Sequence, residues 1–385
     1  MPLSRILLED LPVFVPALSA RSRLMMIAPH PDDESLACSV LLQQAVRAGS
    51  AIRVVYATDG DDNAWPQRVL ERKWHLNASD RRRWGRLRRT EALAALRVLG
   101  VNASVARFLG LPDQKLTALL MCDRRRALER LVTIIDDWAP TDLLVPSISD
   151  THPDHSALAV MTRLALSESA WGVAGRVSVW GYTVHGRSPA FFVHAQTVRQ
   201  SEIETTTKLQ AIRCHKTQLK LSRKRFLAYA ARPERLVKIG RDDKTIPDGS
   251  IVSVSRLPHS LCMEVRLSPK AMRTSQPMLF VLGSDEAGSV RCATIRVPAR
   301  SSRAELLDSV SLNRIGVARY YGNAFSGDLR IPLSIFSPAH AIFVKLERRS
   351  WFFDEAGWLQ VPPARSAQIV EPIHDVPEAR PLAIR

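Results

Sequence analysis

Cysteine is scarce in this chain of 385 residues, and the few cysteines present form no paired motif. They are five in number, widely spaced and never arranged as Cys-x-x-Cys: Cys38, Cys122, Cys214, Cys262 and Cys292. An odd, scattered set does not suit a disulfide framework and is typical of reduced thiols. We therefore expect a cytoplasmic protein.

The chain also lacks a hydrophobic run long enough to cross a membrane. No window approaches the roughly 20 apolar residues that a spanning helix needs. The apolar stretch Leu11–Leu18 is short, contains two prolines and follows Glu9 and Asp10 instead of a basic region, so it does not suit a signal sequence. We predict that residues 1–22 form an extended surface arm and that any membrane contact is peripheral.

Acidic residues are few relative to basic ones. The 54 lysines and arginines outnumber the 38 aspartates and glutamates, which gives a formal charge of +16. Such an excess favours an anionic partner such as a phosphate, a nucleic acid or a lipid headgroup, and charge alone does not choose among them.

What is present is organised around two short polar segments, each placed where a strand gives way to a helix. Ala28–Glu34 (APHPDDE) follows the apolar run Leu24–Ile27, and Ser149–His155 (SDTHPDH) follows the apolar run Asp142–Pro146. In a parallel sheet the ends of different strands share one edge, so two such loops can face each other across a crevice.

One imidazole and several carboxylates converge in the first loop, and histidines return in the second. Acidic residues at a helix start are by themselves typical of capping, because they complement the helix dipole. Two facing His-Pro-Asp loops favour a metal site that neither loop could make alone. We predict His30, Asp33 and His155 as the ligands.

The two segments together resemble the LmbE/PIG-L superfamily of zinc-dependent N-acetylglucosamine deacetylases and related amidases, whose signature pairs an (A/P)HPDDE loop with a later HPDH. The similarity covers about residues 23–220. It includes the further segments ATDG (57–60), RRTE (88–91), FLGLPD (108–113) and KLQAIRCHKTQ (208–218). The resemblance implies one Zn²⁺ per chain, other divalent metals such as Fe²⁺ being alternatives. It also implies removal of an N-acetyl group from an amino sugar or its phosphate- or lipid-linked conjugate.

The predicted metal site suggests catalytic roles for the residues next to its ligands. Three protein ligands with an open fourth position suit a catalytic zinc, which lowers the pKa of bound water. Asp32, beside a ligand, is placed to act as general base, the role that the family gives to the first Asp of the pair. We expect His152 to stabilise the oxyanion or protonate the leaving amine, and Asp154 to hold an imidazole in the required tautomer.

Three alternatives remain open. The motifs bind the scissile amide and not the rest of the substrate, so an amidase acting on another N-acyl conjugate is the nearest. Two histidines and one carboxylate also suit a ferrous oxygenase, although the α/β pattern and the adjacent Asp32 argue against it. The charge alone would suit a non-catalytic module that binds an anionic ligand; we expect no nucleic-acid partner.

Four residues are candidates for substrate binding: Asp59, Arg68, Arg88 and His185. Asp59 follows a strand and could orient a metal-ligand histidine or form an Asx turn. Arg68 and Arg88 belong to a basic stretch, Arg68–Arg89, with interleaved tryptophans, which we expect in a loop at the crevice as a substrate lip. The alternative is a solvated helix face. His185 follows another strand and could approach the substrate or be structural.

The pattern of the chain predicts two domains, for which 46% apolar residues supply an ample core. Strands alternate with helices over residues 23–241, which predicts an α/β, Rossmann-like, mostly parallel sheet with helices on both faces. Short alternating segments spaced by Pro, Gly and Ser follow a linker and predict a sandwich-like β-rich domain over residues 250–361. We expect the tail, residues 362–385, to be loosely held.

Overall fold

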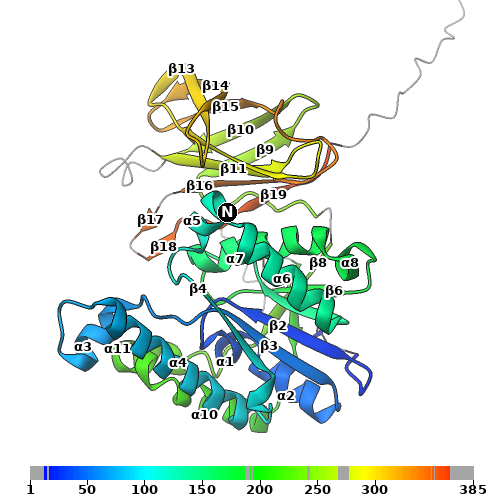
Figure 1. Ribbon diagram of the computed structural model, residues 1–385, viewed down its shortest axis with the longest axis vertical. Coiled ribbons are helices and arrows are strands. Elements are labelled where there is room, and N and C mark those ends of the chain that lie inside the picture. The colour runs from blue at the N-terminus through cyan, green and yellow to red at the C-terminus, as the bar shows by residue number, and fades with distance from the viewer. Residues whose placement is uncertain are drawn as a thin grey trace, which may run out of the picture.

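The structure, a computed structural model, describes residues 13–14, 17–186, 191, 194–240, 243–267, 277–347, 349–350 and 352–364. An eight-stranded sheet with its helices forms one part of the molecule and a nine-stranded sheet forms the other (Figure 1).

The first sheet has the strand order β1-β7-β8-β6-β5-β2-β3-β4. From β6 to β4 all neighbours are parallel, whereas β8 runs antiparallel to both β6 and β7. The predicted mostly parallel sheet is thereby confirmed. Its strands are β1 (Val13–Phe14), β2 (Arg23–Ala28), β3 (Ala51–Thr58), β4 (Ala106–Leu111), β5 (Asp142–Pro146), β6 (Ser178–Tyr182), β7 (Gln196–Val198) and β8 (Arg235–Ile239).

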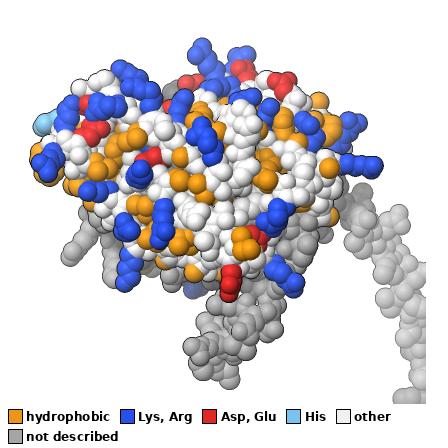
Figure 2. Space-filling view, turned by 90° about the horizontal axis from the view of Figure 1, so that it is seen from below, with side chains coloured by type: hydrophobic (Ala, Val, Ile, Leu, Met, Phe, Trp, Pro, Cys, Tyr) orange, Lys and Arg blue, Asp and Glu red, His pale blue; other side chains and the backbone are white. Residues whose placement is uncertain are grey.

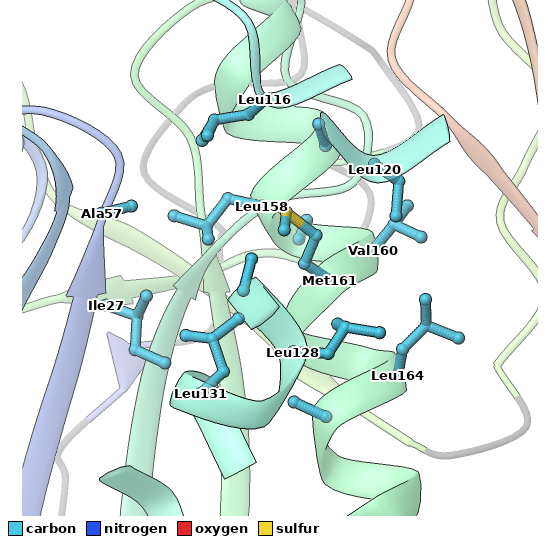
Figure 3. Packing of buried hydrophobic residues seen from close by; sticks show 14 of the residues in the cluster. Ile27, Ala57, Leu116, Leu120, Leu128, Leu131, Leu158, Val160, Met161 and Leu164 are labelled. Atoms are coloured by element: carbon cyan, nitrogen blue, oxygen red, sulfur yellow. The ribbon is translucent and has the colours of Figure 1, made fainter. Parts of the chain in front are cut away.

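Helices cover both faces of this sheet, because its central strands are apolar on both sides. In β2, Met25 and Ile27 join one core cluster while Leu24 and Met26 join another, as expected when successive side chains point to opposite faces. Figure 3 shows the first cluster, in which Ile27 faces leucines of three helices. The helices are α1 (Asp33–Ala37), α2 (Ser39–Arg47), α3 (Ala64–Glu71), α4 (Ala78–Val98), α5 (Leu116–Cys122), α6 (Arg125–Trp138), α7 (Pro153–Glu168), α8 (Ala170–Val173), α10 (Glu202–Cys214) and α11 (Lys216–Leu227), with a 3-10 turn at Ala103–Val105.

The basic stretch is helical and does not form the loop that we expected at the crevice. It comprises the second half of α3, a short connection over residues 72–77 and the first half of α4. A capping box starts α4: the Asn77 side chain accepts hydrogen bonds from two backbone amides of the first turn, and Asp80 accepts one from the Asn77 amide at 3.0 Å. This reciprocal cap stabilises the start of the helix at Ala78, within the stretch that we expected to form a loop.

The second sheet is antiparallel throughout, with the order β19-β16-β11-β12-β13-β14-β15-β10-β9. It curls until its edge strands β9 and β19 contact each other, so a single nearly barrel-like sheet encloses the apolar cluster of this part. The β-rich prediction is confirmed. The strands are β9 (Ile251–Arg256), β10 (Ser260–Arg266), β11 (Met278–Ser284), β12 (Val290–Arg296), β13 (Arg300–Asp308), β14 (Arg314–Asn323), β15 (Ser326–Pro332), β16 (Ile342–Glu347) and β19 (Leu359–Val361), with the two-stranded β17 (Arg349–Ser350) and β18 (Phe353–Asp354) outside the sheet.

The two parts pack against each other. Cys292, Phe343 and Trp358 of the β-rich part belong to the same core cluster as α5 and α7, and the Ser309 hydroxyl donates to the Met121 carbonyl oxygen at 2.6 Å. At the N-terminus, β1 pairs with β7, so part of the predicted arm adds an edge strand. The tail from residue 365 lies outside the described residues.

A buried ion pair ties α10 and β8 to the start of α2. The Lys208 ammonium lies 3.0 Å from Glu234 Oε1, and the Glu234 carboxylate also accepts from the backbone amides of Val40 and Leu41. Both charged side chains are almost wholly buried, so each depends on the other for neutralisation.

We predict that Glu234→Ala lowers the free energy of unfolding by about 3–5 kcal/mol, because it leaves a buried ammonium without its counter-charge. Urea denaturation followed by circular dichroism measures this change. Glu286→Ala, which removes an exposed carboxylate from the β11–β12 turn, should change stability by less than about 0.5 kcal/mol. Equal effects of the two substitutions would contradict the prediction.

Candidate metal centre

The candidate site lies where the order of the first sheet reverses. The chain passes from β2 through β3 to β4 on one side and then returns to place β5 on the other side of β2. The loops after β2 and β5 therefore flank a crevice at the carboxyl ends of the strands, where open α/β sheets bind ligands. These loops carry the two His-Pro-Asp segments, and α1 and α7 begin directly after them.

Two imidazole nitrogens and one carboxylate form a compact triangle in this crevice. His30 Nδ1 lies 3.3 Å from His155 Nε2, and the Asp33 carboxylate lies 3.7 Å from the former and 3.5 Å from the latter. Ligands of a tetrahedral zinc with bonds of about 2.0–2.1 Å stand about 3.3 Å apart, so the triangle fits such an ion.

The opposite nitrogens of both imidazoles face carboxylates. His30 Nε2 lies 3.2 Å from Asp113 Oδ1 and 3.3 Å from Asp154 Oδ2, while His155 Nδ1 lies 3.2 Å from Asp150 Oδ2. A carboxylate accepts a hydrogen bond, which assigns the ring proton to the nitrogen facing it. The nitrogens of the triangle are then left with lone pairs, as a metal ligand requires.

Negative charge is concentrated around these rings. Six carboxylates are buried in or beside the two loops: Asp32, Asp33, Glu34, Asp113, Asp150 and Asp154. Burial raises the pKa of Asp33 to about 6 despite the attraction of His155. Burial also opposes ionisation of Asp150, yet the charge and hydrogen bond of His155 lower the pKa of Asp150 below its usual value. So dense a buried set of acids needs cationic compensation, which a divalent ion would supply.

Two other groups of side chains bring ligand atoms within 4.8 Å of one another: His30 with His152 and His155, and His30 with Asp113 and Asp154. In the first, His152 Nδ1 accepts the Asp154 amide at 3.2 Å. In the second, Asp113 and Asp154 already accept backbone amides at 2.7 Å each. Their geometry favours supporting roles over ligation.

His152 faces the cavity from the start of α7. Burial and the charges of nearby histidines lower the pKa of His152 well below its ordinary value, which favours a neutral ring. Because Nδ1 accepts a backbone hydrogen bond, the proton of that neutral ring resides on Nε2. The Asp154 carboxylate contacts the ring of His30, whereas His152 receives only the Asp154 backbone amide, so the imidazole that the carboxylate orients is the one across the crevice.

Arg88 holds Asp32 instead of presenting its guanidinium to solvent. Arg88 Nη2 donates to Asp32 Oδ2 and to the Pro31 carbonyl oxygen at 3.0 Å each, and Nη1 donates to the Gly60 carbonyl oxygen at 2.8 Å. A Cβ at Gly60, whose φ is +62°, would stand 1.8 Å from Nη1, so only glycine admits this close approach. Arg88 also lines the cavity, so its predicted contact with the substrate stays a prediction beside this positioning role.

The other predicted substrate residues are spread out. His185 borders the cavity beside His152, with ring centroids 5.4 Å apart, and burial lowers the pKa of His185 to about 3. Asp59 forms a two-point contact with Arg89, at 2.7 and 2.5 Å, and neither orients a histidine nor lines the cavity. Arg68 stacks on Trp65, its guanidinium carbon 5.4 Å from the ring centroid.

Of the two interpretations of the basic stretch, a solvated helix face agrees better with the structure than a substrate lip does. Several of its cations pair with local carboxylates: Lys73 and Arg83 with Asp80, Arg81 with Asp62, and Arg83 also with Glu71. Trp84 is buried in the core, while Trp65 and Trp74 are exposed. Figure 2, which views the molecule from below, shows basic side chains spread over this face with few acidic ones.

A cavity of about 540 Å³ opens above the triangle, and His30, Asp32 and His152 reach its surface. It contains side chains that sequence reasoning missed, notably Arg225 of α11 and Phe353 of β18. Sequence reasoning also missed Asp113 and Asp150 as partners of the two imidazoles. Their position in loops directly after strands was a signal that could have identified them. Nothing in the alternating pattern of the last third singles out Phe353.

Comparison with known proteins assigns part of the chain. Residues 25–166 match the family described as PIG-L, GlcNAc-PI de-N-acetylase. A 1D-myo-inositol 2-acetamido-2-deoxy-alpha-D-glucopyranoside deacetylase of Mycobacterium sp. (strain KMS) is 29% identical over 180 residues, which cover 43% of this chain and 56% of that protein. The enzyme of the same description from Mycobacterium avium (strain 104) is 32% identical over 146 residues, covering 34% and 47%. The chain thus spans about half the length of these curated relatives.

Among solved structures, a triple mutant of a deacetylase involved in the teicoplanin biosynthetic pathway aligns with a TM-score of 0.44 and 20% identity, over 58% of this chain and 99% of that one. Like the family match, this alignment leaves a large share of the chain uncovered. Residues 25–166, which carry both His-Pro-Asp loops, form a PIG-L (LmbE-like) domain.

Proposed function

We propose that this chain is a metal-dependent amide hydrolase that removes the acetyl group from an N-acetylated amino sugar or sugar conjugate and releases acetate. The observation that carries the proposal is the buried triangle of His30 Nδ1, Asp33 and His155 Nε2, which adjoins a cavity lined by His30 and by Asp32. The amino sugar is supported by the description of the matched family and by the names of the curated relatives.

His30, Asp33 and His155 would hold one divalent ion. Two imidazoles and a carboxylate suit Zn²⁺ in a catalytic site, and the same donors also accept Fe²⁺. When bound, such an ion polarises the amide carbonyl and brings the pKa of a coordinated water to about 7.

Asp32 takes the proton of the attacking water. Its carboxylate is fixed by Arg88, whose own donors are fixed by the Pro31 and Gly60 carbonyl oxygens. The Asp32 carboxylate is therefore held in one orientation, so its position relative to the metal-binding triangle is set before the substrate binds.

His152 stabilises the oxygen that gains charge as water adds to the carbonyl. Its Nδ1 is occupied by the Asp154 amide, so Nε2–H is the donor that remains for the substrate. A neutral donor held at the cavity surface strengthens its hydrogen bond as negative charge develops.

No helix in the described part of the chain is long and apolar enough to cross a membrane. We further propose that the protein is cytoplasmic and that its substrate is phosphate- or lipid-linked.

The proposed hydrolysis is tested by measuring acetate release from free, nucleotide-linked and lipid-linked N-acetyl sugars. Activity should be lost on chelation, and its recovery with Zn²⁺ or with Fe²⁺ identifies the metal. If the protein binds an anionic sugar equally well after chelation and hydrolyses no N-acetyl sugar, it is instead the non-catalytic module that binds an anionic ligand.

We expect His30→Ala, Asp33→Ala and His155→Ala each to lose bound metal together with activity, because two remaining ligands hold the ion poorly. The loss of metal is checked by measuring the metal content per chain with inductively coupled plasma mass spectrometry. Asp59→Asn is the matched control, since its carboxylate contacts Arg89 and not the triangle. A ligand variant with full metal content would contradict the assignment.

Asp32→Asn should retain the metal and the fold but lose turnover by about 10²–10⁴-fold, the usual contribution of a general base. The measurement pairs metal content with kcat on the preferred substrate. A near-normal kcat, or a metal-free protein, would remove Asp32 from this role.

His152→Ala should lower kcat by about 10²–10³-fold with a smaller rise in KM, because its hydrogen bond strengthens only in the transition state. His75→Ala, at an exposed histidine between α3 and α4, should leave both constants unchanged. If His152 only packs the loop, kcat in a folded, metal-loaded variant stays normal.

A further inference from the structure

The two-stranded β17–β18 segment brings the β-rich part of the chain to the mouth of the candidate site. In Figure 1 it lies apart from the barrel-like sheet, on the side of the α/β part. The Asp354 amide donates to the Thr151 carbonyl oxygen at 2.8 Å, and the Trp358 amide donates to the Ile148 carbonyl oxygen at 2.9 Å. These bonds fix the segment on the loop that carries Asp150 and His152.

A buried ion pair anchors the same segment from the other side. Lys345 of β16 pairs with Asp354, and both side chains are 1% exposed. Gly357 packs so tightly that a Cβ there would stand 2.1 Å from the Ile148 carbonyl oxygen. The segment is thus held between the barrel-like sheet and the loop after β5, so its side chains have fixed positions over the site.

Phe353 covers the histidines. Its ring centroid is 5.9 Å from that of His152 and 5.1 Å from that of His185, and the Arg225 guanidinium carbon lies 5.5 Å from the ring centre. Phe352, the residue before it, lines the cavity and is 42% exposed. The two aromatic residues form a wall above the polar floor.

Two further exposed apolar side chains line the same cavity. Trp65 of α3 and Leu221 of α11 line it and are 43% and 49% exposed, so with Phe352 three elements each present a large apolar side chain to one opening. Exposed apolar surface gathered at one cavity marks a binding site. A cavity of about 540 Å³ lies within the range of about 300–1,000 Å³ that takes drug-sized ligands.

We infer that Phe352 and Phe353 are specificity-determining residues that, with Trp65 and Leu221, bind an apolar group carried by the N-acylated substrate. This inference rests on the proposed function. The apolar group is an alkyl or aryl moiety on the sugar's aglycone or on the acyl chain; both present the same chemistry to the wall. The β-rich part is on this view a wall of the active site, not a separate binding module.

The test compares two substrate series in metal-loaded enzyme. One series is methyl, butyl and octyl N-acetylglucosaminide; the other is methyl glucosaminide N-acylated with acetyl, butanoyl and octanoyl groups. Wild-type kcat/KM should rise with chain length in one series, by up to about fourfold for each methylene that is buried. The series that rises identifies the position of the apolar group.

In Phe352→Ala and Phe353→Leu this dependence on length should shrink, with a larger loss of kcat/KM on the longest substrate of the rising series than on the shortest, since the acetamido group contacts the floor. Phe325→Ala is the matched control and should keep the wild-type dependence, because Phe325 is an exposed phenylalanine of the β-rich part that lies outside the cavity lining. A flat wild-type profile in both series, or parallel losses on all substrates, would overturn the inference.

Binding without turnover separates this inference from the proposed function. The octyl and methyl glucosaminides, which are the amine products, are titrated into each protein calorimetrically. The wall is supported if wild type and Phe325→Ala bind the octyl compound with a lower Kd than the methyl compound and Phe352→Ala does not. This result would hold even if no N-acetyl sugar is hydrolysed. Hydrolysis with no preference in Kd for the octyl compound, and with no rise in kcat/KM along the acyl series, leaves the proposed function standing and rejects the wall.

Discussion

The concentration of buried negative charge at the reversal point of the first sheet governs the rest of the site. Asp33, Asp113, Asp150 and Asp154 are nearly inaccessible to water, and each must be compensated by a cation, an imidazole or backbone amides. The structure does this by using the same carboxylates to bind the loops together. Asp154 accepts amides of the loop after β4 while facing His30, which lies after β2.

This arrangement links the geometry of the site to the stability of the fold. Asp150 accepts the amides of Val184 and His185 after β6 as well as facing His155, so the loops after four parallel strands converge on the two imidazoles. Glu34 serves the same purpose further out, since its carboxylate lies 2.9 Å from His215 Nε2 at the start of α11. Chemistry and packing therefore depend on one set of hydrogen bonds.

The β-rich part is joined to this network and does not stand apart from it. The Asp354 and Trp358 amides bind the loop after β5, and Trp358 belongs to the core cluster that underlies that loop. The family match ends at residue 166. Three residues that line the cavity of this chain, Arg225, Phe352 and Phe353, lie beyond it.

The sequence by itself determined the α/β alternation, the β-rich last third and the two loops that bring His30, Asp33 and His155 together. These follow from local signals, because periodicity and motif spacing are written in neighbouring residues. Only the tertiary structure decided that Arg88 holds Asp32, that Asp59 contacts Arg89, that Asp154 orients His30, and that Phe353 covers His152. Three of these four pairs join residues more than 50 positions apart in the chain. Asp59 and Arg89 meet only because α4 packs beside the loop after β3. No periodicity encodes such contacts, and the packing of loops around the shared edge of the sheet alone creates them.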